Sequence, residues 1–395
     1  MNRRQFLRAA AGFAAIFASR RPLSAAGYDL VIAGGRVIDP SQRVDRIADI
    51  AIRAGRIAAI RRRISPSDTA QTIDARGRII TPGLIDIHLH ARDAALPPSE
   101  ILSTGVTTMV DAGSRGADNV DQLIEIARHA PNRMRILLNI GRLGNNPNGR
   151  AEFLDGLEPA DVEKARAAVA RNREWIVGMK ARLSRGIAGD RDLQVLQRAI
   201  QVADPLKIPI MIHMGDTASP LPQILALLRP GDIVSHMYAP TPHGIMDDAG
   251  VVLPEVREAR RRGIRFDFGN GRTEHWSWDV AQSALRQGFP PDTISSDLDL
   301  AGRKEQVLDL PNVLSKFLLM GMPLNQVIAC ATSNAAKAFR EFNPYGTLRP
   351  GAVADVTVLE ETRGDFEFVD NFRNKRNGSR KLVARAVVVG GRRVV

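Results

Sequence analysis

The hydrophobic positions at the two ends of the chain come in short runs separated by Gly, Pro and Asp, which is typical of β-strands joined by turns. In the N-terminal part the predicted strands are 29–32, 35–38, 47–52, 56–60 and 71–74. In the C-terminal part they are 354–359, 384–389 and 392–395. Both ends of the chain are thus rich in predicted strands, whereas the middle has a different pattern. This arrangement predicts a small β-sandwich domain assembled from residues 27–82 and 343–395.

The middle of the chain, residues 83–342, alternates strand-like runs with helical stretches. The predicted strands are 84–90, 107–111, 135–140, 177–182, 209–213, 233–236, 265–268 and 293–297. Helical patterns lie between most of them, such as 161–172, 190–203, 221–228 and 254–262. This alternation predicts an α/β fold, the (β/α)8 or TIM barrel, whose active site lies at the C-terminal ends of the strands.

Ionisable and metal-binding side chains gather at those strand ends. They are His88, His90, Lys180, Arg182, His213, His236 and Asp297. Because side chains alternate along a strand, His88 and His90 share one face. The chain has seven histidines, and four of them fall at predicted strand ends, which favours a metal site over chance placement.

Lys180 is unusual because an unpaired ammonium inside an apolar strand is costly. An ammonium has no lone pair, so it cannot bind a metal directly. It could form an ion pair with Asp297, or react with CO₂ to give a carbamate whose two oxygens bridge two cations. The residues by themselves do not choose between these alternatives.

Composition narrows the class of protein. Hydrophobic residues make up 44% and charged residues 25%, so a globular protein with a sizeable core is expected. A lone cysteine, Cys330, excludes internal disulfides and Cys-rich metal sites. The net charge is +12, but five arginines lie in residues 1–26, and the remaining +7 is scattered. A nucleic-acid groove would need clustered basic residues, so a nucleic-acid partner is not expected.

Residues 1–26 look like a targeting segment. Arg3-Arg4 is followed by Phe6-Leu7, an apolar run at 9–18 and small residues at Ala25-Ala26. This order resembles a twin-arginine export signal, with cleavage near Ala25-Ala26. Ten apolar residues are too few to span a bilayer stably. We expect the export machinery to be a partner and the mature protein to be periplasmic, without a membrane span.

The set of strand-end residues resembles the binuclear-metal amidohydrolase superfamily. This resemblance runs from about residue 28 to the C-terminus. It implies two divalent cations, usually zinc, with His88, His90 and Asp297 on the more buried ion. His213 and His236 would hold the other ion, and an N6-carboxylated Lys180 would bridge both. Manganese or iron could replace zinc.

Several motifs narrow the resemblance to the deacetylase branch, which includes dihydroorotase-like metallohydrolases. They are Gly105–Thr108 with Asp111–Ser114, 176–184, 212–225, 228–238, 288–299 and 309–324. The chain departs from these relatives at Asn270 and Asp299, where a histidine is often found. These departures bear on substrate choice, since neither position is a predicted metal ligand.

The implied reaction is hydrolysis of an acyl bond in N-acetyl or O-acetyl derivatives of small carboxylic acids. Metal binding lowers the pKa of water to about 7, and two metals can share a hydroxide. That bridging hydroxide would attack the acyl carbon, while Asp297 takes its proton and passes it to the leaving atom. The enzyme class is a hydrolase of non-peptide carbon–nitrogen bonds, with esterase activity on the O-acetyl compounds.

Three residues are candidates for contact with a small-molecule substrate. Arg182 shares the face of Lys180 and could bind a carboxylate bidentately. Arg92, two residues after His90, resembles an arginine that meets the substrate carboxylate in dihydroorotase-like relatives, which keeps a cyclic amide or ureide hydrolase as an alternative. Tyr238 could donate to an oxyanion. A non-catalytic scaffold barrel is a further alternative, but it would lack ligands that are all present here. The residues do not fix the oligomeric state, and a homo-oligomer is one alternative because helical outer faces commonly pair in such barrels.

Overall fold

The computed structural model describes residues 27–395 except 93, 146–152, 154 and 241. The predicted export signal at 1–26 therefore lies outside the described residues. Within the described part of the chain, no helix combines the length and apolar character needed to cross a membrane.

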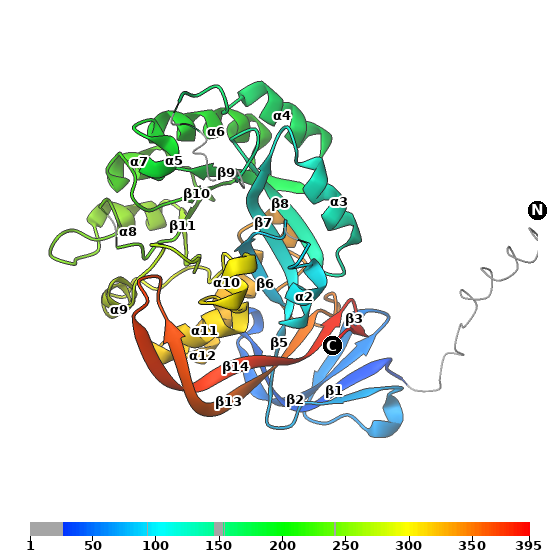
Figure 1. The fold of residues 1–395 in the computed structure, drawn as a ribbon. Coiled ribbons are helices and arrows are strands. Elements are labelled where there is room, and N and C mark those ends of the chain that lie inside the picture. The colour runs from blue at the N-terminus through cyan, green and yellow to red at the C-terminus, as the bar shows by residue number, and fades with distance from the viewer. Residues whose placement is uncertain (1–26, 93, 146–152, 154, 241) are drawn as a thin grey trace, which may run out of the picture.

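A curled parallel sheet of seven strands forms the middle of the molecule (Figure 1). Its order is β12-β11-β10-β9-β8-β7-β6, so every strand pairs with its neighbour in sequence. The strands are β6 (Leu84–Leu89), β7 (Val106–Gly116), β8 (Arg133–Asn139), β9 (Ile176–Arg182), β10 (Ile210–His213), β11 (Ile233–Ser235) and β12 (Arg265–Asp267). All the pairs are parallel, which confirms the predicted α/β fold and places all seven carboxyl ends on one rim.

Helices cover the outer side of this sheet (Figure 1). They are α2 (Pro98–Ser103), α3 (Asp121–His129), α4 (Val162–Arg171), α5 (Arg185–Ala188), α6 (Asp192–Leu206), α7 (Leu221–Leu227), α8 (Pro254–Arg261) and α9 (Trp278–Arg286). The later helices are α10 (Leu300–Lys304), α11 (Leu310–Leu319), α12 (Leu324–Cys330) and α13 (Ser333–Ala336), and short 3-10 turns lie at Pro40–Gln42, Pro66–Asp68 and Arg340–Phe342. Strand side chains such as Met179 and Ile212 share a core with Val195 and Ala199 of α6, so burial of this apolar face holds the helices on the sheet.

The predicted eighth strand, 293–297, does not form a regular strand. Isolated parallel bridges nevertheless join this segment to both edges of the sheet, Thr293 to Asp267 and Leu298 to Leu89. Asp297 N also donates to His88 O at 2.6 Å. Asp297 has φ of 47°, which interrupts the extended conformation that a strand needs. The structure is therefore a seven-stranded half-barrel whose open side carries an irregular segment.

Strands from the two chain ends form a second sheet. Its order is β15-β14-β13-β5-β1-β2-β3, with β4 paired to β1. The strands are β1 (Leu30–Asp39), β2 (Val44–Arg53), β3 (Arg56–Arg61), β4 (Thr72–Asp74), β5 (Ile79–Pro82), β13 (Val356–Val369), β14 (Lys375–Val389) and β15 (Arg392–Arg393). Hydrogen bonds run through all eight strands, so the two chain ends share one continuous sheet, and apolar residues of these strands form a common core. The arrangement of this sheet as a β-sandwich stays a prediction. The domain boundaries at 82 and 343 stay a prediction.

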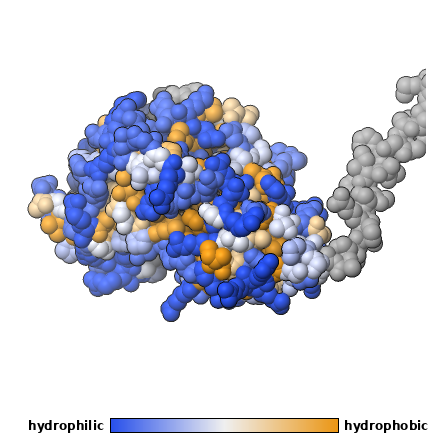
Figure 2. All heavy atoms as spheres, turned by 90° about the horizontal axis from the view of Figure 1, so that it is seen from below, coloured by the Kyte–Doolittle hydropathy of each residue, from blue (hydrophilic) through white to orange (hydrophobic). Residues whose placement is uncertain are grey.

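The β13–β14 hairpin extends from this second sheet alongside α11 and α12 (Figure 1). Leu382 N of β14 donates to Ser315 Oγ of α11 at 2.9 Å. Near the hairpin turn, Trp278 Nε1 donates to Asn374 O at 3.0 Å. The C-terminal hairpin thus supports the loop that follows β12. Figure 2 shows the face seen from below, where hydrophobic residues lie in small groups among hydrophilic ones.

Candidate active site

The carboxyl ends of the strands bring all six predicted metal-binding side chains together. Five of them line a cavity of about 220 Å³. The cavity is lined by His88, His90, Arg92, Asn145, Lys180, Arg182, His213, Arg272, Thr273, His275, Asp297 and Asp299. The sixth, His236, is fully buried beneath it, with its ring centroid 4.3 Å from that of His213 and 5.0 Å from that of His88.

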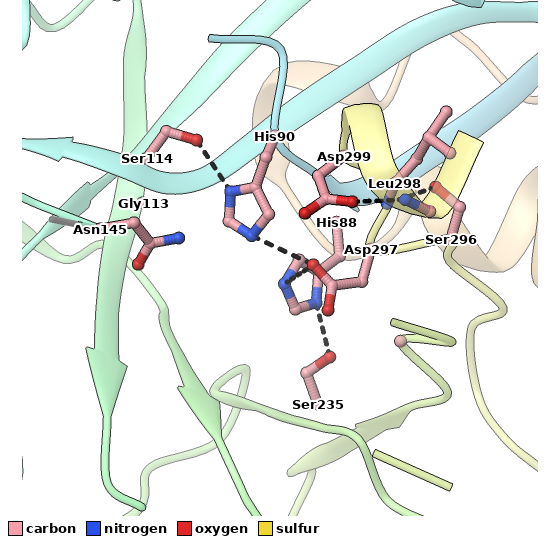
Figure 3. Close-up of polar contacts among 12 residues, drawn as sticks. His88, His90, Gly113, Ser114, Asn145, Ser235, Ser296, Asp297, Leu298 and Asp299 are labelled. Carbon is pink, nitrogen blue, oxygen red and sulfur yellow. Dashed lines mark hydrogen bonds and ion pairs between the residues drawn. The ribbon is translucent and has the colours of Figure 1, made fainter. Parts of the chain in front are cut away.

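Asp297 is the centre of this cluster (Figure 3). Its Oδ1 lies 3.0 Å from His90 Nε2 and 3.4 Å from His88 Nε2. Its Oδ2 lies 3.8 Å from His236 Nε2. One carboxylate from the irregular segment therefore meets imidazoles from β6 and from the end of β11.

The Nδ1 atoms of His88, His90 and His236 are hydrogen-bonded in a way that fixes the tautomer of each ring. His90 Nδ1 lies 2.8 Å from Ser114 Oγ, whose proton goes to Asp111 Oδ2 at 2.7 Å, so Ser114 must accept from His90 Nδ1–H (Figure 3). His88 Nδ1 lies 2.7 Å from Ser235 Oγ, which in turn donates to a buried aspartate. Such outer partners are typical of metal-binding histidines because they orient the ring.

The same logic applies to His236, whose Nδ1 donates to Gly269 O at 2.7 Å. In the neutral rings of His88 and His236 the Nε2 lone pair then lies toward the Asp297 carboxylate. Lone pairs that face an anion repel it unless a cation lies between them. His236 Nε2 is moreover buried without a hydrogen-bond partner. The donor set therefore fits a divalent cation.

Burial sets the charge state of the ligands. It lowers the pKa of His88, His213 and His236 well below the usual range of histidine, which keeps these rings neutral. A neutral imidazole is the form that binds a metal. Burial also lowers the pKa of Lys180 to about 7, and its Nζ lies 3.1 Å from His88 Nε2.

Gly113 makes room for Lys180. This glycine has φ of 85°, and a Cβ at this position would lie 2.6 Å from Lys180 Cβ and 2.7 Å from Lys180 Cγ. The Asp111–Ser114 motif therefore contributes to the site in two ways. Ser114 orients the His90 ring, and the absence of a side chain at Gly113 leaves space for the Lys180 side chain. The aspartate behind His88, Asp267, also accepts from Thr293 Oγ1 and Ser295 Oγ, which ties β12 to the irregular segment.

The substrate-facing residues are only partly as predicted. Arg92 and Arg182 both line the cavity, and Arg92 Nη1 donates to Asn145 O at 3.1 Å. Tyr238 does not line it: this residue is fully buried and its hydroxyl donates to Phe289 O at 2.9 Å. The reason is the φ of 67° at His236, which turns the chain after β11 so that strand alternation no longer predicts where Tyr238 points. A role for Tyr238 in oxyanion binding is therefore wrong.

The two departures from the family pattern lie in different places. Asn270 is buried and points away from the cavity, with its Oδ1 accepting from Lys316 Nζ at 2.8 Å. Asp299 lines the cavity, caps α10 through Gly302 N at 2.7 Å, and pairs with Arg272 Nε at 3.0 Å. Only the second departure faces the substrate space.

The loop after β12 supplies residues that the sequence does not single out. Arg272, Thr273 and His275 all line the cavity. His275 lies in a stretch without strand or helix periodicity, so its direction could not be predicted. The only signal was its type, because a histidine near a catalytic rim is a candidate ligand. His243, the other histidine in a rim loop, instead places its Nδ1 3.0 Å from Thr217 O.

Comparisons with known proteins agree with this geometry. Residues 79–394 match the Amidohydrolase family. A deacetylase of Agrobacterium fabrum is 33% identical over 347 residues, which cover 85% of this chain and 84% of that protein. Among solved structures, an adenine deaminase gives a TM-score of 0.84 at 29% identity, covering 93% of this chain and 99% of that one. A dihydroorotase gives 0.83 at 30% identity, covering 93% and 97%. The chain therefore belongs to the amidohydrolase family and is a hydrolase that acts on carbon–nitrogen bonds.

Proposed function

We propose that this protein removes the acetyl group from N-acetyl or O-acetyl derivatives of small carboxylic acids. The observation that carries the proposal is the cavity itself. Its lining combines the imidazoles around Asp297 with the guanidinium groups of Arg92 and Arg182. A cavity that fits cations and also offers arginines suits a small acid with a scissile acyl bond.

Two divalent cations, usually zinc in this family, would bind among the imidazoles and Asp297. His88, His90 and Asp297 would hold one, and His213 and His236 the other. Lys180, extended by CO₂ to a carbamate, would reach both. When bound, such ions lower the pKa of water and polarise the acyl oxygen.

The protein's own side chains would transfer the proton and position the substrate. Asp297 accepts a proton from the attacking water as the new carbon–oxygen bond forms. It returns this proton to the leaving nitrogen or oxygen as the acyl bond breaks, so that acetate and the free amine or alcohol leave. Arg92 or Arg182 would hold the substrate carboxylate and fix the acyl carbon near Asp297.

A cyclic amide or ureide hydrolase is the second candidate. It is favoured by the position of Arg92, which follows His90 by two residues and lines the cavity, and by the likeness to the solved dihydroorotase. The two functions share the water-attack step and differ in whether the acyl group leaves or stays attached in the opened ring.

An activity screen on zinc-loaded protein tests the proposal. It compares N-acetyl amino acids and O-acetyl hydroxy acids with cyclic ureides, and pairs each acid with its uncharged amide. We expect acetate release, with kcat/KM at least tenfold higher for the acid than for its amide, because a charged hydrogen bond contributes about 1.5–3 kcal/mol. Dialysis against a chelator should abolish the activity and zinc should restore it. Turnover of ureides alone would select the second candidate, and no turnover of any class would refute both.

We also propose that residues 1–26 direct export to the periplasm through the twin-arginine pathway. Replacing Arg3 and Arg4 by lysine in the full chain should leave the protein in the cytoplasmic fraction, whereas the unaltered chain should reach the periplasm, cut near Ala25-Ala26. Light scattering of the mature protein tests the homo-oligomer alternative, and a monomer mass would contradict it.

A further inference from the structure

The loop that follows β12 brings a fifth imidazole into the metal-binding cluster. The ring of His275 stacks on that of His236, with centroids 4.0 Å apart and planes 23° apart. It also meets the ring of His213 edge-on at 5.0 Å. His275 is thus in contact with both histidines of the second ion and comes from a different part of the chain.

The loop is built to hold His275 in this place. Gly271 has φ of 57°, and a Cβ there would lie 1.7 Å from His275 Nδ1 and 2.7 Å from Asp297 Oδ2. Any other residue at 271 would collide with the imidazole. Asn371, just after β13, clamps both ends of the turn, since its Oδ1 accepts from His275 N at 3.0 Å and its Nδ2 donates to Gly271 O at 3.0 Å.

Two ring nitrogens in this group lack a hydrogen-bond partner. His275 Nδ1 and His236 Nε2 are both buried without a hydrogen bond, although His275 Nδ1 lies 3.3 Å from Asp297 Oδ2. One nitrogen from each of His213, His236 and His275 lies within 4.8 Å of the other two. Zinc–nitrogen bonds of about 2.0–2.1 Å place two ligands of one ion up to roughly 4 Å apart, so small ring rotations would bring all three onto one ion.

We propose that His275 completes a three-imidazole site with His213 and His236, which binds the second cation without help from Lys180. The proposal rests on the metal site of the proposed function and adds a ligand that this function does not require. Three neutral imidazoles form a complete protein ligand set for zinc and leave a position open for water or substrate. Occupancy of this ion would then not depend on carbamate formation.

Metal stoichiometry of purified mature protein tests this, with four variants beside the wild type. These are Lys180→Met, His275→Gln, the double variant, and His129→Gln as a matched control on the exposed surface of α3. Zinc is measured by mass spectrometry after dialysis, and affinity by competition with a chelator. We expect about two zinc ions in the wild type, in Lys180→Met and in the control. We expect about one in the double variant, because its second site keeps only two imidazoles.

The proposal is overturned if Lys180→Met alone falls to one zinc ion, or if it and the double variant bind zinc equally well. Should Lys180→Met fail to fold, as judged by circular dichroism, His275→Gln by itself decides: its second zinc should bind at least tenfold more weakly than in the control, in line with losing a ligand. Equal affinity overturns the proposal. Hydrolysis is assayed separately, so wild-type protein that binds two zinc ions but cleaves no acetylated acid would refute the function and not the site.

Discussion

Replacing Asp297 by asparagine separates the chemistry of this residue from its place in the fold. Position 297 has φ of 47°, a conformation that asparagine tolerates far better than alanine. The amide keeps the size of the carboxyl and one oxygen for a cation. It loses the negative charge and the ability to accept a proton. The Asp297 side chain is 8% exposed, so bulk water has little access with which to replace the lost base.

The size of the effect follows from this role. A positioned general base contributes about 10²–10⁴-fold, equivalent to roughly 3–5 kcal/mol of transition-state stabilisation. We therefore expect kcat of Asp297→Asn to fall about 1,000-fold while KM changes little, because the arginines proposed to hold the substrate carboxylate are untouched. Initial rates with the best acetylated acid from the screen measure both constants, and mass spectrometry reports zinc.

The matched control is Asp161→Asn. Asp161 caps α4 by accepting from Lys164 N, away from the cavity, and asparagine caps a helix equally well. This control should keep wild-type kcat. If Asp297→Asn retains zinc and keeps kcat within tenfold of wild type, Asp297 does not carry the proton. If the variant loses zinc together with activity, its main role is to hold the cations.

Four further substitutions probe the cavity and the buried Lys316. Of Arg182→Ala and Arg92→Ala, the one that removes the carboxylate contact should raise KM for acidic substrates about 10- to 100-fold with kcat nearly unchanged; if neither does, the substrate is not an acid. Gly113→Ala should displace Lys180 and lower kcat in a chain that still folds by circular dichroism, and a wild-type kcat would contradict this role. Lys316→Met should lower the melting temperature, because three acceptors around the Lys316 ammonium lose their donor. Burial lowers the pKa of Lys316 to about 7, so the unfolded chain holds a proton that the folded one has lost above that pH. The wild-type free energy of unfolding should therefore rise relative to Lys316→Met between pH 7 and pH 10, and a flat difference would show that Lys316 stays charged in the fold.

Much of the site could be predicted because the signal is local and repeated. Strand alternation places His88 and His90 on one face, and the order of strands and helices predicts that their ends share a rim. Lys180 and His213 follow from the same rule, since each lies at the end of a regular parallel strand. Their convergence needs no information beyond the period of the pattern and the direction of the chain.

Where the chain leaves the extended conformation, this rule stops working. His236 and Asp297 both have positive φ, so residues beyond them, such as Tyr238, no longer follow strand alternation. The continuous sheet shared by the two chain ends depends on the pairing of β5 with β13, which are far apart in sequence.

The sequence by itself therefore determined the order of the elements, the kind of ligands and the rim on which they lie, because each depends on neighbours a few residues away. Only the tertiary structure decided that His275 enters the cluster and that Asn270 turns away from it. Those directions are set by contacts with Asn371 and Lys316, residues brought close by the folding of distant segments. A loop without periodicity takes its conformation from such partners, and no local pattern records them.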